Sequence, residues 1–249
     1  MNIANLLPIS PDEKVTSMIR VPEFDEDKYL VMVTRKGIIK RIALNAYNTA
    51  RKGGLIALEL NDGDELAWVR LTDGSANVII ATRLGMAIRF KETDVRPMGR
   101  PARGVKALTM KDGDEVIGMS VVRENALVLT VSETGFGRLS SADDYRLQSR
   151  GGKGLTNYHI EKYGKVAAIK VVDLDDDVII ISQDGIIIRI AAESIRVCSR
   201  PSKGVTVMKV GEGDKVVTVA RTPHEEEAEE ADGEALENES DEPTEENAE

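Results

Sequence analysis

Arg150-Gly151-Gly152-Lys153-Gly154 is the segment that decides the fold, because variants of it stand at three other places in the sequence. The pattern R-x-x-[RK]-G returns at Arg100-Pro101-Ala102-Arg103-Gly104 and at Arg200-Pro201-Ser202-Lys203-Gly204. The first copy, Ala50-Arg51-Lys52-Gly53-Gly54, keeps two basic residues but shifts them. We call each of these segments a corner. Their last glycines are spaced 50 residues apart, and such a fixed period is typical of repeat architectures.

Short aliphatic segments lie at the same places in every repeat, and each is bounded by turn residues. Val and Ile favour the pleated, half-buried surface of a sheet, so each segment predicts a strand. A glycine three residues after a hydroxyl side chain, as at Thr34 and Gly37, predicts a hairpin turn between the first two strands. The predicted strands are 30–33, 78–81, 127–131 and 178–181 (first), 38–43, 86–90, 136–140 and 186–191 (second), 55–60, 105–110, 155–159 and 205–210 (third), and 66–71, 116–122, 166–172 and 216–220 (fourth).

Four short strands in each 50 residues predict an all-β protein, a propeller-like array of four-stranded blades with about four full repeats. Each blade buries its apolar face only against its neighbours. No corner glycine precedes Val15, so we expect the array to begin inside a repeat, as a fragment or truncated product of something longer. The predicted units are remnant strands of a preceding blade at 1–22, blades at 23–71, 72–122, 123–172 and 173–222, and a disordered acidic tail at 223–249.

Charge is distributed unevenly along the 249 residues, although the net charge is −10. Residues 225–249 hold 14 of the 43 acidic side chains and neither Lys nor Arg. The remaining residues carry 33 basic and 29 acidic side chains, so the predicted blades are mildly basic. A basic body with an acidic tail indicates a partner such as nucleic acid.

The recurring basic residues are the candidate binding site. One basic pair at the same corner of every blade would line the rim of the array with positive charge, which suits the continuous phosphates of a bent duplex. The alternative is a solvated, salt-bridged edge of an ordinary propeller, but recurrence at a fixed offset favours an anion-binding rim. The candidates are Arg51, Lys52, Arg100, Arg103, Arg150, Lys153, Arg200 and Lys203 at the corners, and Lys40, Arg41, Arg89, Arg138 and Arg189 on the second strands.

Catalysis and metal binding have little support in the sequence. His159 and His224 stand far apart without a partner His or Cys, and Cys198 has no plausible base beside it. Only two of the four acidic turns are acid-rich, and they lack the spacing of a calcium loop. Tyr47 and Tyr145 occupy a slot that holds Val or Ile in the other repeats, so we predict that they are core residues. We therefore predict no catalytic residue and no metal.

Cellular location follows from similar exclusions. The single cysteine argues against a disulfide framework and favours a reducing compartment. No segment approaches the roughly 18 apolar residues that a membrane span requires. The first five residues lack the charged region of a signal peptide. We predict a cytoplasmic protein without membrane contact.

The corners carry a resemblance to a known family. Gln148-Ser149-Arg150-Gly151-Gly152-Lys153-Gly154 resembles the gyrase box, Q-R-R-G-G-[RK]-G, of the C-terminal domains of DNA gyrase A, with Ser149 in place of an arginine. Thr34 to Arg41 also resembles a gyrase blade. The resemblance spans residues 1–222 and implies a six-bladed β-pinwheel, a relative of the propeller with a strand exchanged between blades. It implies that duplex DNA wraps on the basic outer rim and thereby directs ATP-dependent negative supercoiling.

Two departures from the family qualify this resemblance. Only four full repeats are present, and by their order they look like the last four blades. Because the true gyrase box belongs to the first blade, Gln148 to Gly154 would be a later, degenerate copy. The parts that cut DNA and bind ATP are absent, and no tyrosine here inherits the role of the cleaving tyrosine.

The family also implies the partners. They are double-stranded DNA, the rest of gyrase A, and gyrase B in an A2B2 holoenzyme of type IIA topoisomerase on the chromosome. The chain itself needs no cofactor, because ATP and Mg²⁺ are used elsewhere in the holoenzyme. On its own, it is not expected to be an enzyme.

Three alternatives stay open. The related C-terminal domain of topoisomerase IV shares the fold, usually with fewer blades. A propeller scaffold that binds proteins would show apolar or aromatic hot spots on one face, and a propeller enzyme would need converging polar residues in a central channel. The acidic tail is either a solubilising end or a competitor of DNA for the basic rim.

Overall fold

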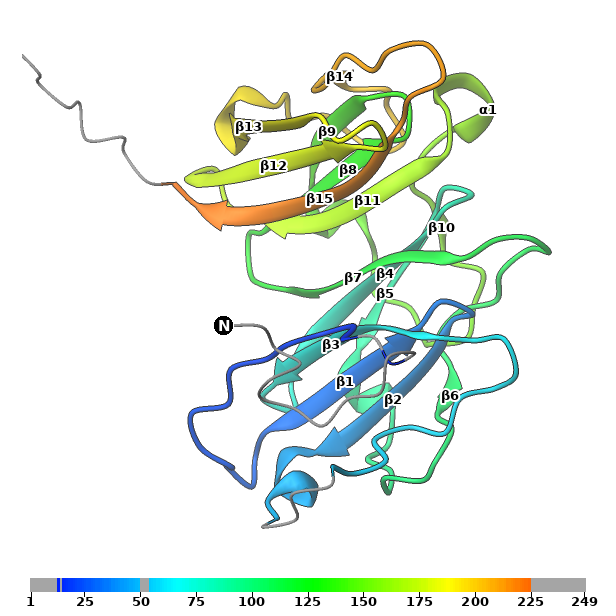
Figure 1. Cartoon of the computed structure of the whole chain (residues 1–249), viewed down its shortest axis with the longest axis vertical. Coiled ribbons are helices and arrows are strands. Elements are labelled where there is room, and N and C mark those ends of the chain that lie inside the picture. Colours follow the sequence, from blue (N-terminus) through cyan, green and yellow to red (C-terminus); the bar gives the residue numbers. More distant parts are fainter. Residues whose placement is uncertain (1–12, 14, 50–53, 225–249) are drawn as a thin grey trace, which may run out of the picture.

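The computed structural model describes residues 13, 15–49 and 54–224, and these form four antiparallel sheets that follow one another along the chain (Figure 1). The predicted all-β fold of propeller-like blades is confirmed. From the inner to the outer strand, the sheets are β3 (Leu66–Thr72), β1 (Tyr29–Thr34), β2 (Ile38–Ala43) and β6 (Val105–Lys106); β7 (Val116–Val122), β4 (Asn77–Thr82), β5 (Met86–Lys91) and β10 (Leu155–Thr156); β11 (Val166–Val172), β8 (Leu127–Ser132), β9 (Phe136–Ser141) and β14 (Val205–Thr206); and β15 (Val216–Pro223), β12 (Asp176–Ser182) and β13 (Ile187–Ala191).

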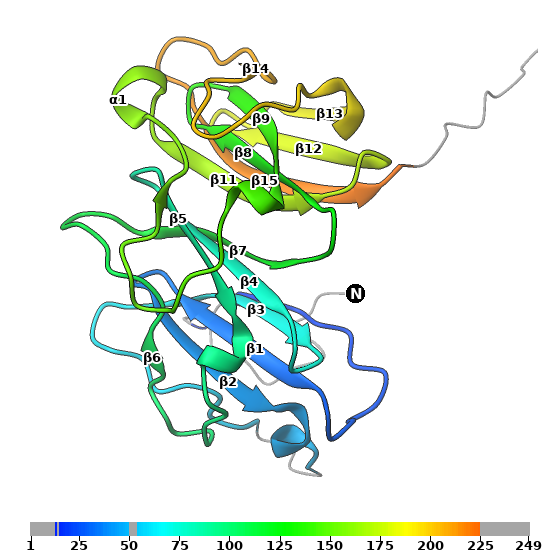
Figure 2. The ribbon, with the colours of Figure 1, turned by 180° about the vertical axis from the view of Figure 1, so that it is seen from behind.

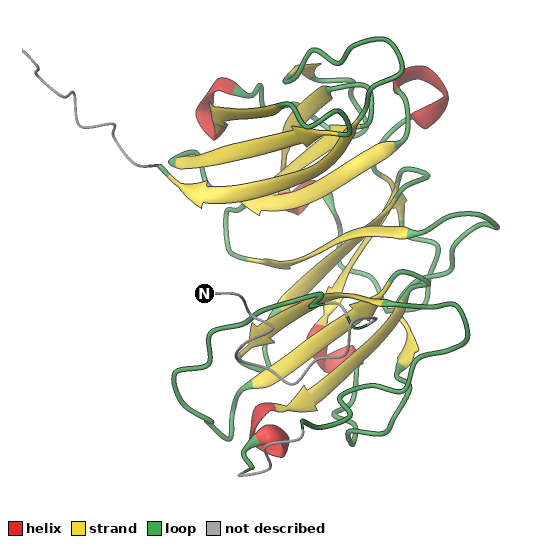
Figure 3. Ribbon diagram, in the orientation of Figure 1, coloured by secondary structure: helices red, strands yellow, loops and turns green. Residues whose placement is uncertain are grey.

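Helical structure is limited to single turns among the described residues, drawn red in Figure 3. A turn of 3₁₀ helix follows the second strand of each sheet, and a short α-helix precedes β11. They are η2 (Leu44–Tyr47), η3 (Glu92–Asp94), η4 (Ala142–Asp144), η5 (Ala192–Ser194) and α1 (Ile160–Tyr163).

The outer strand of each of the first three sheets comes from a later repeat. In the first sheet, Val105 and Lys106 of β6 pair with Ile39 and Ile38 of β2. β10 and β14 pair with β5 and β9 in the same register. A strand is therefore exchanged between neighbouring blades, and each corner, which directly precedes its exchanged strand, lies at the outer edge of the preceding sheet (Figure 2).

These exchanged strands are the third strands of the sequence, and their predicted length is wrong. They span two residues instead of five or six, and 55–60 forms no strand. The reason is visible in the hydrogen bonds after β10, where the amides of Asn157 and Tyr158 both donate to the carbonyl of Gly85. This forked contact turns the chain away from the ladder after two residues.

The glycine that ends each of the last three corners is required by close backbone packing. Gly154 has a φ of +76°, and a Cβ there would lie closer than 3.0 Å to the carbonyl oxygen of Ala87 in β5. Gly104 and Gly204 have the same backbone conformation and the same kind of neighbour on β2 and β9. Only glycine combines a positive φ with this approach, which explains why the fixed-period residue is glycine.

The core lies between the sheets. One cluster joins Val31 and Val33 of the first sheet to Val78 and Ile80 of the second. Further clusters join the second sheet to the third, and the third to the fourth. Each blade therefore buries its apolar surface against its neighbours, as expected for a repeat array.

Replacing Gly154 with Ala should lower the free energy of unfolding by about 2–4 kcal/mol, because strain at positive φ adds to the clash with Ala87. Gly54 is the matched control. Its φ is +75° but a Cβ would meet nothing within 4 Å, so Gly54→Ala should cost only about 1 kcal/mol. Urea unfolding followed by circular dichroism measures both. Equal losses in the two variants would contradict the packing role of the corner.

Candidate nucleic-acid interface

Arg150 and Arg200, the first arginines of two of the corners, tie successive repeats together. In Arg150, Nε donates to the carbonyl of Asp94 at 3.0 Å and Nη1 to that of Lys106 at 3.2 Å. Arg200 makes the equivalent bonds to Asp144 at 2.9 Å and Thr156 at 2.7 Å. Each guanidinium thus joins its own corner to an exchanged strand and a 3₁₀ turn of the preceding repeat. The arginine of the R-x-x-[RK]-G pattern has a structural use that the sequence did not indicate.

The other predicted corner residues differ in their surroundings. Arg100 is half-buried and forms no side-chain hydrogen bond or ion pair with a described residue. Arg51 and Lys52 lie outside the described residues. The remaining three corner cations, Arg103, Lys153 and Lys203, are exposed.

Two of these exposed cations have partners. Arg103 Nη2 lies 2.6 Å from Glu59 Oε1, and this contact lowers the pKa of the Glu59 carboxyl. The Lys203 ammonium lies 3.7 Å from the ring centroid of Phe136, in a cation–π contact. Lys153 forms no side-chain hydrogen bond or ion pair with a described residue, so its charge is the most available of the three.

Three of the second-strand cations are enclosed, and this burial disfavours their predicted role as DNA contacts. Lys40 and Arg138 are 0% exposed and Arg41 is 7% exposed. An enclosed charge cannot face a phosphate, and it persists inside a protein only where polar groups surround it. The sequence position did not reveal this, because the groups that enclose a side chain come from distant parts of the chain, as Ser202 does for Arg138.

Backbone carbonyls of the corners surround two of these charges. Lys40 Nζ donates to the carbonyls of Ala57 at 2.7 Å, Ala102 at 3.1 Å and Arg100, and burial lowers its pKa. Arg138 Nε donates to the carbonyl of Ser202 at 3.0 Å. Each cation therefore holds the corner of a later repeat against the strand that carries it.

Arg89 and Arg189 are engaged in a different way. Arg89 Nη1 donates to the carbonyl of Ala142 at 2.7 Å and lies 3.3 Å from Asp143. Arg189 pairs with Asp177 at 2.6 Å, and the carboxyl of Asp177 also contacts His224. These contacts, first from His224 and then from Arg189, lower the pKa of Asp177. The second strands therefore contribute little free positive charge.

Sequence reasoning missed a second periodic set of cations. Arg96, Arg146 and Arg196 stand eight residues before a corner glycine, and position 46 of the first repeat is alanine. All three are exposed, and none forms a side-chain hydrogen bond or ion pair with a described residue. The spacing of 50 residues was the available signal.

The backbone fixes these arginines at the outer edge. Each follows a buried side chain, as Arg146 follows Tyr145, which is 0% exposed. The next residue bridges to the second strand of the preceding sheet, as Leu147 does to Arg89. The arginines therefore lie on the same side of successive blades as the corners. The burial of Tyr145 also agrees with its predicted place in the core, whereas Tyr47 is half-buried.

The segment predicted as a degenerate gyrase box is held mainly through its backbone. The amide of Gln148 donates to the carbonyl of Arg89 at 2.9 Å, and the amide of Gly151 to that of Ala107 at 2.6 Å. Gln148 Nε2 is enclosed without a hydrogen-bond partner. Within this segment, Ser149 and Lys153 are exposed.

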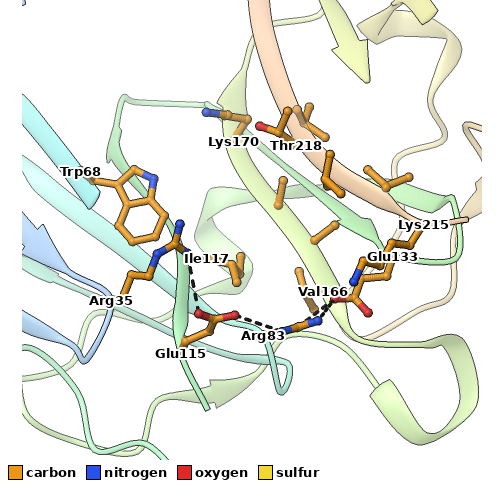
Figure 4. Close-up of a pocket in the computed structure, with 15 residues that line it drawn as sticks. Arg35, Trp68, Arg83, Glu115, Ile117, Glu133, Val166, Lys170, Lys215 and Thr218 are labelled. Atoms are coloured by element: carbon orange, nitrogen blue, oxygen red, sulfur yellow. Dashed lines mark hydrogen bonds and ion pairs between the residues drawn. The ribbon is translucent and has the colours of Figure 1, made fainter. Parts of the chain in front are cut away.

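The centre of the array contains a pocket lined by two paired arginines and by two further cations, Lys170 and Lys215. Residues of β3, β7, β11 and β15 line a central pocket of about 290 Å³ (Figure 4). At its mouth, Glu115 lies between Arg35 and Arg83, and Glu133 pairs with Arg83 at 2.6 Å. The carboxylates neutralise these two arginines. No group of His, Cys, Asp or Glu in the described ranges is arranged to hold a metal ion.

The array of sheets and the recurring corners match a known family. A model described as the DNA gyrase C-terminal domain, β-propeller, matches residues 28–73, 76–123, 126–173 and 176–223. The chain belongs to the DNA gyrase C-terminal domain family. The resemblance of the corners and of Thr34 to Arg41 to this family is thereby confirmed.

Curated relatives of this gyrase C-terminal domain are DNA gyrase A proteins. That of Clostridium acetobutylicum is 54% identical over 105 residues, 42% of this chain and 13% of the relative. That of Halalkalibacterium halodurans is 55% identical over 104 residues, 42% of this chain and 12% of the relative. The matches thus cover about an eighth of the relatives' length.

Solved structures share the fold of this gyrase C-terminal domain. The C-terminal domain of DNA topoisomerase IV has a TM-score of 0.84 and 25% identity, covering 90% of this chain and 70% of that one. The DNA gyrase A C-terminal domain has a TM-score of 0.79 and 27% identity, covering 89% of this chain and 75% of that one. No helix in the described part is long and apolar enough to span a membrane.

Arg138→Met tests the structural role of the enclosed cations. The substitution leaves the carbonyls of Ser202 and Asn157 without their donor, so it should lower the free energy of unfolding by about 3 kcal/mol. The control is Lys153→Met, an exposed site where the change should stay within about 0.5 kcal/mol. Urea unfolding measures both variants. If Arg138→Met has normal stability but binds DNA more weakly, Arg138 contacts DNA and does not act mainly as a structural residue.

Proposed function

We propose that this chain is a DNA-binding and DNA-wrapping domain of DNA gyrase A. Its basic outer edge bends duplex DNA and so directs the ATP-dependent negative supercoiling of the holoenzyme. Membership of the gyrase C-terminal domain family supports this proposal. The observation that carries it is the set of exposed arginines at one repeat position, Arg96, Arg146 and Arg196, none of which has an ion-pair partner in the described residues.

The proposed contact surface combines this set with the exposed cations of the corners. It consists of Arg96, Arg103, Arg146, Lys153, Arg196 and Lys203. Arg150 and Arg200 stabilise the backbone of this surface, because their Nε and Nη1 groups donate to backbone carbonyls. Repetition at 50-residue intervals places equivalent charges on successive blades. A duplex that follows the edge can then meet one group of these cations at each of the last three corners.

Affinity on such a surface comes from phosphates, with little reading of base sequence. Bending a short duplex costs about 1–6 kcal/mol, which the distributed cations offset. With six cations and about 0.9 counterions released for each, the logarithm of affinity should fall with the logarithm of salt concentration at a slope of about −5. Binding should therefore weaken about 10³-fold between 50 and 200 mM salt.

In this proposal the chain bends and positions the DNA, and it neither cleaves DNA nor hydrolyses ATP. DNA cleavage and ATP hydrolysis, with its Mg²⁺, belong to other parts of the proposed A2B2 holoenzyme, which contains the rest of gyrase A together with gyrase B. The domain presents a wrapped segment of DNA to them. This role places the protein on the chromosome in the cytoplasm. The role of the acidic residues 225–249, as a solubilising end or as a competitor for the basic edge, lies outside the described residues.

Replacing Arg96, Arg146 and Arg196 together with Ala should weaken duplex binding and reduce the salt slope by about 3, because three phosphate contacts are lost. Fluorescence anisotropy with a labelled duplex at several salt concentrations measures both quantities. The control is Arg123→Ala with Arg221→Ala, which removes cations at or after the inner strands β7 and β15. Its slope should stay close to the native value. A native slope in the triple variant would remove these arginines from the interface.

The second candidate function is that of a C-terminal domain of topoisomerase IV, and the TM-score of 0.84 to such a domain favours it specifically. The two proposals differ in whether the chain wraps DNA. Relaxed circular DNA is incubated with the chain, sealed with ligase and resolved by gel electrophoresis. A gyrase-type domain should shift the linking number, whereas binding without a shift would favour presentation of DNA in the manner proposed for topoisomerase IV.

A further inference from the structure

The fourth sheet lacks the outer strand that completes the other three. It consists of β15, β12 and β13, and among the described residues nothing pairs with the outer side of β13. Two large apolar side chains at this open edge, Ile186 and Ile187, are 50% and 63% exposed. A Cβ at the hairpin glycine, Gly185, would meet nothing within 4 Å, whereas one at Gly85 or Gly135 would meet the backbone that follows the exchanged strand. An open strand edge with exposed apolar side chains is a site for strand addition.

The segment after the first corner is the matching strand without a sheet partner among the described residues. Residues 54–56 follow the same pattern as the exchanged strands, yet they pair with no hairpin in the described part of the chain. Ile56 is 73% exposed, the highest value among the large apolar side chains at the corners and sheet edges. A Cβ at Gly54 would meet nothing, whereas one at each later corner glycine would meet the carbonyl of a preceding strand. Within its described residues, the chain thus has one strand segment without a sheet partner, at Leu55 and Ile56, and one sheet edge without a strand, at β13.

The register of the three complete sheets defines how donor and acceptor fit. In each, the residue after the corner glycine pairs with the second residue after the hairpin glycine, as Val105 does with Ile39. The next corner residue pairs with the residue directly after the hairpin glycine, as Thr156 does with Met86. The same rule matches Leu55 with Ile187 and Ile56 with Ile186. The three exposed isoleucines are therefore members of one missing strand pair.

We propose that the open edge of β13 binds Leu55 and Ile56 of a second copy of this chain, so that copies associate head to tail. This interaction goes beyond the proposed binding of DNA and does not depend on it. Association of this kind is heterologous and extends the array of blades until it closes or is capped. It also continues the exposed cations of one copy into those of the next.

A second copy fits the edge better than the same chain does. The first and fourth sheets lie at opposite ends of the molecule in Figure 1. The residues after the donor are anchored to the first sheet and its neighbour, since Lys40 binds the carbonyl of Ala57 and Arg103 pairs with Glu59. Arg138 binds the carbonyl of Asn157 in the same way beside the exchanged strand β10. The donor is therefore held as its counterpart in a complete sheet is held.

The contact is small, so the association should be weak. Two paired residues and a few isoleucine side chains bury far less than the area of a stable interface. We expect a dissociation constant on the order of 0.1–1 mM. The experiment must therefore trap the contact covalently.

Mixing the Ile56→Cys chain with the Ile186→Cys chain tests the register directly. Both chains also carry Cys198→Ser, which removes the natural thiol. Under mild oxidation the mixture should form a covalent heterodimer. The control replaces Ile186→Cys by Leu147→Cys, another exposed apolar site at 46% exposure that lies away from β13. Heterodimer several-fold above this control supports the proposal, and a yield equal to the control overturns it.

A complementation experiment distinguishes head-to-tail contact from other association. Ile56→Asp blocks the donor and Ile187→Asp blocks the acceptor, and both sites are exposed, so the fold should tolerate the changes. In analytical ultracentrifugation at high concentration, each variant alone should be monomeric while the mixture forms dimers that stop at two copies. If either variant alone associates like the native chain, the pairing is wrong. If both the mixture and the native chain stay monomeric, a second copy does not bind the edge of β13. That result would favour a different strand as the partner, such as one from a longer parent protein.

Discussion

The close approach of each corner to the hairpin of the preceding repeat is the contact on which the rest of the structure depends. The corner glycine lies so near a carbonyl of the neighbouring strand that no Cβ fits, and this approach places the exchanged strand at the edge of that sheet. Each blade is then completed by its successor, and the apolar clusters between sheets can close. Gly104, Gly154 and Gly204 are therefore positions at which the packing tolerates no side chain.

Positive charge serves two purposes at this contact. Lys40 and Arg138 donate to carbonyl groups of the corners. Arg150 and Arg200 donate to carbonyl groups of the 3₁₀ turns and the exchanged strands. Arg96, Arg146 and Arg196 project from the same region without partners in the described residues. The first group makes the edge rigid, and the second is free to meet an external anion. A count of basic residues near the corner cannot separate these groups.

The fold could be predicted from the sequence because it follows from periodicity, whereas only part of the candidate site, Arg103, Lys153 and Lys203, could be. The hairpins and inner strands agree with their predicted ranges within three residues, since aliphatic alternation and turn glycines are local signals. The exchanged strands were predicted too long, because their end depends on a forked hydrogen bond to Gly85 from a distant part of the chain. Burial decides whether a lysine or arginine holds neighbouring backbone or can contact DNA. At Arg138, burial depends on a loop 64 residues away. Arg96 and its equivalents have the same period as the corners, but they lie outside the R-x-x-[RK]-G pattern that marks the corners.

Because of strand exchange, one 50-residue sequence repeat does not correspond to one sheet of the structure. A sheet takes its hairpin from one repeat and its outer strand from another, and the three complete sheets use one register. Any corner is thus compatible with any hairpin. A gene that lost or duplicated 50 codons would still present matching partners at the junction, so the number of blades can change in evolution without a new kind of contact.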